Sequence, residues 1–159
     1  MSIKPQETCA RRGYVVGLIK DVYILLVAIM FEIIDWEQAL EQVADDQEFL
    51  EEILGDLITE TEDALGRIVD GVTQGSFTVV MKAAHQVKGS TAYLYCAQVQ
   101  ETAKKLQALA NEGVTISATS QTGRDSGVIW SETAVLFATL KEEFAALKEE
   151  IQNHKWEGK

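Results

Sequence analysis

Residues 78–94, TVVMKAAHQVKGSTAYL, carry two parallel stripes that predict an amphipathic helix. One stripe is apolar and advances in steps of four and three residues, as a buried helix face does. It comprises Val80, Ala84, Val87, Thr91 and Leu94. The other stripe is polar or small and keeps the same rhythm, through Thr78, Lys82, His85, Gly89 and Ala92. We therefore expect the helix to bury the first stripe and to direct His85 toward solvent.

Three residues of this helix predict phosphoryl chemistry. Lys88 and Gly89 follow His85 by one turn on the same face. An exposed imidazole is a nucleophile near neutral pH and can carry a phosphoryl group on a ring nitrogen, and Lys88 would supply positive charge to the phosphoryl oxygens. Glycine inside a helix costs about 0.5–1 kcal/mol relative to alanine, so Gly89 indicates close approach of a partner. The alternative is a surface histidine beside a surface lysine, which isolated pairs with this spacing usually are.

The stretch His85-Gln86-Val87-Lys88-Gly89-Ser90 resembles the His-x-x-Lys-Gly-Ser signature of histidine-containing phosphotransfer (HPt) proteins. Its residues are most similar to those of the eukaryotic type. The resemblance extends from about Asp35 to Asn153 and includes Phe77, an aromatic residue two turns before the histidine. It implies an all-α fold, an antiparallel four-helix bundle. The chain has Tyr93-Leu94-Tyr95 where the family commonly has a glycine shortly after the signature, which leaves the shape of that helix end open.

The resemblance also implies a function, that of a histidine phosphotransfer intermediate in a multistep two-component phosphorelay. His85 would accept a phosphoryl group from an aspartate in the receiver domain of a sensor histidine kinase and pass it to the receiver domain of a response regulator. Lys88 would stabilise phosphoryl charge, and Gly89 would give the partner clearance. No cofactor is expected in this chain, because the partner supplies the magnesium ion and the catalytic aspartate. The alternative is a transfer-inactive helical adaptor or scaffold bundle, which would keep the apolar seams but would not need these three residues together.

Composition supports one soluble helical domain and excludes several functions. The chain has 159 residues, 47% of them hydrophobic, and its one proline, Pro5, precedes every expected bundle helix. A net charge of -11 argues against nucleic-acid binding. We find no Gly-rich nucleotide loop and therefore expect no ATP-dependent kinase activity. Cys9 and Cys96 lie far apart and form no Cys-x-x-Cys pair, so we expect no disulfide framework and a reducing, intracellular setting. The family resemblance, through the partners it requires, implies a cytoplasmic or nuclear location.

A metal-binding bundle is the other class of function considered. Its core sites use a glutamate three residues before a histidine on paired helices. Here Lys82 occupies that position before His85, and the second histidine, His154, lies in the tail. We therefore expect no metal site.

The chain divides into three parts: an apolar N-terminal extension (1–34), expected to be helical, the HPt domain (35–153) and a frayed tail (154–159). The apolar run Val22–Phe31 is shorter than the ~18–20 residues of a membrane span. It fits a buried helix that packs beside the bundle away from His85, or else a targeting segment.

Within the domain, turn and capping residues predict the helix boundaries. Asp35 should cap a short helix over Trp36–Val43, and Asp45 should start a long helix that ends between Gly71 and Gln74. Ser76 should cap the His85 helix. The next helix should end at Asn111-Glu112-Gly113, and residues 114–130 should form a long flexible loop before a final helix capped by Ser131. Gly55 and Gly66 within the long helix fit either close helix contacts or tolerated defects.

Overall fold

The computed structural model describes residues 32–119 and 124–156, and the regular elements within these ranges are all helices. The predicted all-α bundle is therefore confirmed, whereas the predicted N-terminal helix lies almost wholly outside the described residues. The helices are α2 (Trp36–Gln42), α3 (Gln47–Thr73), α4 (Phe77–Tyr93), α5 (Ala97–Thr119) and α6 (Ser126–Asn153).

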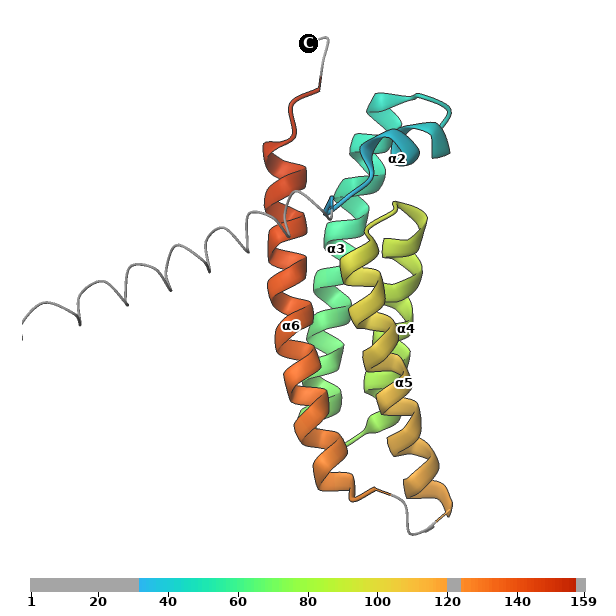
Figure 1. Ribbon diagram of the computed structural model, residues 1–159, viewed down its shortest axis with the longest axis vertical. Helices are drawn as coiled ribbons and strands as arrows, with labels where there is room; N and C mark the ends of the chain where they lie inside the picture. The colour runs from blue at the N-terminus through green and yellow to red at the C-terminus, as the bar shows by residue number, and fades with distance from the viewer. Residues whose placement is uncertain (1–31, 120–123, 157–159) are drawn as a thin grey trace, which may run out of the picture. The chain divides into compact units, whose positions relative to one another are not determined.

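The four long helices form an antiparallel bundle, with the short α2 at one end (Figure 1). Short turns join α3 to α4 and α4 to α5, so each pair forms a helical hairpin. Helix α4 packs between α3 and α5, while α6 packs against α5 and α3. One long face of α4 therefore remains outside the bundle.

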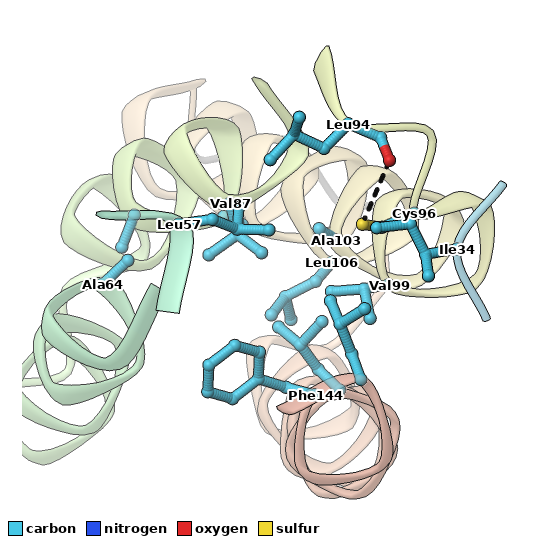
Figure 2. Close-up of a cluster of buried hydrophobic side chains, with 14 of the residues drawn as sticks. Ile34, Leu57, Ala64, Val87, Leu94, Cys96, Val99, Ala103, Leu106 and Phe144 are labelled. Atoms are coloured by element: carbon cyan, nitrogen blue, oxygen red, sulfur yellow. Dashed lines mark hydrogen bonds between the residues drawn. The ribbon is translucent and has the colours of Figure 1, made fainter. Parts of the chain in front are cut away.

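The bundle core explains why α4 has a fixed rotation about its axis. All five residues of its predicted apolar stripe are buried. Val87 lies among side chains from the neighbouring helices, as Figure 2 shows. These include Leu57 and Ala64 of α3, Ala103 and Leu106 of α5, and Phe144 of α6. Fully burying a side chain of this size stabilises a fold by about 1.5–3 kcal/mol, so rotating α4 about its axis would be costly.

The prediction that residues 114–130 form a loop is wrong over most of its length. Helix α5 continues to Thr119, and α6 already begins at Ser126. Gly113 does not end a helix. It is buried where α5 meets Phe77, since a Cβ at this position would lie 2.5 Å from the Phe77 ring. Phe77 in turn stacks on Trp130, with ring centroids 3.8 Å apart, and these contacts form a second apolar cluster.

Two of the predicted helix caps stand at the predicted residues, and the caps of α3 and α6 do not. The Asp35 carboxylate accepts the amide of Gln38, as predicted. The cap of α3 is Asp46 rather than Asp45, because Asp45 takes a left-handed backbone (φ 62°) in the preceding turn. The cap of α6 is Asp125, whose carboxylate accepts the Gly127 amide. The predicted cap of α6, Ser131, instead lies inside the helix, where its hydroxyl donates to a backbone carbonyl.

Two glycines of α3 have no packing role. An added Cβ would meet nothing within 4 Å at Gly55 or Gly66, so neither marks a close helix contact.

The described part of the tail is not frayed. His154 stacks on Trp36 with ring centroids 3.6 Å apart, and Trp156 contacts both rings edge-on.

Cys96 lies in the bundle core. It is a free thiol, and burial raises its pKa to about 12. A thiol with such a pKa stays protonated and unreactive at neutral pH.

Among the described helices, none is both long and apolar enough to cross a membrane.

Candidate functional site

The outer face of α4 presents the predicted site residues to solvent. His85 and Gly89 are exposed and Lys88 is half-buried. Thr78 and Lys82 extend the exposed face toward the start of the helix. The prediction that His85 points away from the core is confirmed, and the three site residues share one surface.

His85 is held from the neighbouring helix by Gln107. The side-chain amide nitrogen of Gln107 on α5 lies 3.1 Å from Nδ1 of His85. Among the described residues, no hydrogen bond engages the other ring nitrogen, Nε2. The contact therefore orients the imidazole and leaves Nε2 open toward solvent.

This contact couples the Gln107 amide to the tautomer of His85. When the amide N–H donates to Nδ1, the ring proton resides on Nε2. When the amide turns over, its oxygen accepts from Nδ1–H, and Nε2 then carries a free lone pair. Only the second state makes Nε2 a nucleophile. One glutamine can thus hold the ring in place in either tautomer.

The two remaining motif residues differ in what the fold requires of them. Lys88 makes no ion pair with any described residue, so its ammonium group is free to meet an incoming anion. Gly89 needs no space within the fold, because a Cβ there would find nothing within 4 Å. The conformational cost of a helical glycine therefore has no explanation in packing. Gly55 and Gly66 are equally free of contacts, so partner clearance at Gly89 stays a prediction.

Helix α3 braces the other side of α4. Arg67 of α3 donates to the side-chain carbonyl of Gln86, the residue after His85. The Ser90 hydroxyl donates to a carboxylate oxygen of Glu60 at 3.1 Å. The segment that carries His85 is thus tied to α3 by polar contacts and to α5 through Gln107.

The turn after α4 contains a strained residue where the resemblance leads one to expect glycine. Tyr95 has a φ of 56°, in the left-handed region that glycine adopts without strain. Its hydroxyl lies 3.4 Å from the side-chain oxygen of Gln42, to which it donates. The helix end therefore keeps a left-handed turn although no glycine is present.

Comparisons with known proteins agree with this geometry. The Hpt domain family model matches residues 52–154, which is more than half of the chain. The chain belongs to the Hpt domain family. Its fold is similar to that in the crystal structure of the HPT domain from a sensor hybrid histidine kinase from Shewanella, with a TM-score of 0.56 and 14% sequence identity. That similarity covers 78% of this chain and 97% of the other. No curated protein matched the chain.

Sequence reasoning missed Gln107 as a site residue of this Hpt domain. The signal was present in the hairpin geometry, since His85 and Gln107 each lie eleven residues from Cys96, at the turn between α4 and α5. Residues equidistant from the turn of an antiparallel helix pair face each other. The periodicity of one helix does not contain this information.

Metal ligands do not cluster in the part of the Hpt domain that the structure describes. Within residues 32–119 and 124–156, no group of three or more histidine, cysteine, aspartate or glutamate side chains could hold a metal ion.

Proposed function

We propose that this Hpt domain is a phosphorelay intermediate that accepts a phosphoryl group on His85 from a receiver-domain aspartate and passes it to a second receiver domain. One observation carries the proposal: His85 is solvent-facing, its Nδ1 is engaged by Gln107, and its Nε2 is open. Lys88 and Gly89 lie on the same surface, where an incoming phosphoryl group would need charge and space.

In the proposed reaction, the Nε2 lone pair forms a P–N bond as the P–O bond of the aspartyl phosphate breaks. The aspartate leaves as a carboxylate, and the Nδ1 proton stays on the ring, hydrogen-bonded to the Gln107 oxygen. Lys88 stabilises the phosphoryl oxygens during transfer. The receiver supplies the magnesium ion, and the chain uses no cofactor and no ATP of its own. Transfer to the next receiver is the reverse of these steps.

Incubation with a phosphorylated receiver domain tests the proposal. We expect the chain to acquire an acid-labile, base-stable label, which is the signature of phosphohistidine. His85→Gln should abolish the label while leaving the helical circular dichroism spectrum unchanged. The only other histidine, His154, serves as the matched control, so His154→Gln should be labelled like the parent. A label that survives His85→Gln would refute the assignment.

The role of Gln107 has its own test. Gln107→Glu keeps an acceptor for Nδ1–H and should support transfer, whereas Gln107→Leu removes it. A hydrogen bond of this kind contributes about 1 kcal/mol, so Gln107→Leu should slow transfer on the order of five- to tenfold. Equal rates for both variants would show that Gln107 does not position the imidazole.

A further inference from the structure

The charge of α4 is opposite to that of the whole protein. The chain has a net charge of -11, yet α4 contains two lysines, Lys82 and Lys88, and no acidic residue. Helix α3 beside it has eight acidic residues and a single basic one, Arg67. The positive charge of this hairpin is therefore concentrated around His85.

Arg67 is placed so that it adds to this positive region. Asp63 and Asp70 lie one turn away from it on α3, where ion pairs commonly form. Arg67 nevertheless donates across the helix boundary to the neutral Gln86, and it forms no ion pair with a described residue. Among the described residues, three other cations do form ion pairs: Lys104, Arg124 and Lys148. The guanidinium group is thus held beside α4 by Gln86, with no ion pair to a described carboxylate.

Arg67 and Lys82 share a concave surface. Together with Val79, Ala83 and Gln86 they line an open depression of about 210 Å³ between α3 and α4. Lys82 precedes His85 by three residues and Gln86 follows it directly, so the depression borders the phosphoryl site. Lys82, like Arg67, has no ion pair within the described ranges.

We propose that Arg67 and Lys82 form a docking subsite for a carboxylate on the surface of the receiver domain, and that this contact helps to select the partner. The inference rests on the proposed phosphotransfer function. The occupant follows from charge complementarity, because two unpaired cations in a depression attract an anionic side chain and a guanidinium binds carboxylate through paired N–H groups. Such contacts mainly raise the association rate and exclude partners of the wrong charge.

Two phosphoryl donors of different size distinguish an effect on receiver docking from an effect on the phosphoryl-transfer step. A phosphorylated receiver domain must dock, whereas phosphoramidate is a small donor whose P–N bond breaks as the His85 P–N bond forms, with ammonia leaving. Arg67→Glu and Lys82→Glu should each slow transfer from the receiver on the order of tenfold at low ionic strength, and added salt should narrow the difference from the parent. Labelling by phosphoramidate should be unchanged.

Lys141→Glu is the matched control, because Lys141 is an exposed cation on α6 and the charge change is the same. It should alter transfer by less than about twofold. Arg67→Gln is a milder variant in case the glutamate perturbs folding, and it should give an intermediate rate and a parental melting curve.

Three results would overturn the subsite. Parental transfer rates would remove its role, and losses equal to that of Lys141→Glu would show only a general charge effect. Slower phosphoramidate labelling would place the cations on the phosphoryl group rather than on a partner carboxylate. Failure of the proposed function is distinguishable, because the parent chain itself would then accept no phosphoryl group from any receiver.

Discussion

Replacing Gly89 should separate the stability of the fold from the function of the site. Helical glycine costs about 0.5–1 kcal/mol relative to alanine, and a Cβ at this position meets nothing within 4 Å. Gly89→Ala should therefore raise the free energy of unfolding by about 0.5–1 kcal/mol and the melting temperature by roughly 1–4 °C. A residue kept for the fold would show the opposite change.

The same face should not tolerate a large side chain during transfer. Gly89→Leu adds bulk directly beside the exposed His85, so it should leave the fold stable and slow receiver transfer by about tenfold or more, which corresponds to about 1.4 kcal/mol of activation free energy. Labelling of His85 by phosphoramidate should persist, because a small donor needs less room.

Gly55 on α3 supplies the control for both measurements. It is also an exposed helical glycine with nothing within 4 Å, and it lies on a different helix from His85. Gly55→Ala should gain similar stability, and Gly55→Leu should transfer like the parent. Urea titrations give the stabilities and rapid-mixing transfer assays give the rates. Parental transfer by Gly89→Leu, or a loss of stability in Gly89→Ala, would refute the reasoning.

Four further changes test the site and the fold. Lys88→Ala should slow transfer without lowering the melting temperature, because an unpaired surface charge contributes little stability; a drop in melting temperature would contradict this. Burial raises the pKa of the Glu143 carboxyl above its ordinary value of 4.5. The folded protein therefore favours the protonated carboxyl, and the free energy of unfolding falls as the pH rises above 4.5 and the carboxyl ionises. Glu143→Gln should therefore raise the free energy of unfolding more near neutral pH than near pH 4.5. An equal gain at the two pH values would contradict this pKa shift. Tyr95 has a φ of 56°, so Tyr95→Gly should be more stable than Tyr95→Ala by about 1 kcal/mol in a urea titration. At an ordinary helical position the order of the two variants would be reversed. Gly113→Ala should cost about 1–3 kcal/mol through overpacking against Phe77, and Phe77→Leu in the same chain should recover part of that loss.

The features that depend on one helix alone could be predicted from the sequence. The two stripes of α4 recur at helical spacing, so its buried and exposed faces follow from local periodicity. The placement of His85, Lys88 and Gly89 on the outer face follows for the same reason, whereas their chemistry stays a prediction. The residue that caps each helix could not be predicted as well. Neighbouring residues such as Asp45 and Asp46 compete for one cap position, and the geometry of the turn decides between them.

Features that depend on two helices could not be predicted in this way. Gly113 looks like a helix terminator, and only its contact with Phe77 shows that it lets α5 and α4 approach closely. Arg67 looks like one charge among many on an acidic helix, until its bond to Gln86 places it beside the site. Both pairings depend on the rotation of each helix within the bundle, and the whole core sets that rotation.

In the proposed phosphorelay, the bracing of α4 would let one exposed helix face serve two successive partners. Gln107 holds the imidazole from α5, while Arg67 holds Gln86 from α3, so both neighbours of the site are fixed before any partner arrives. Little side-chain ordering then remains to be completed on docking, which lowers the entropic cost of each encounter. Gly89 between these contacts carries no side chain and needs no ordering. A surface prepared in this way suits brief, repeated contacts, because it can favour correct orientation without tight binding that would delay release of the partner.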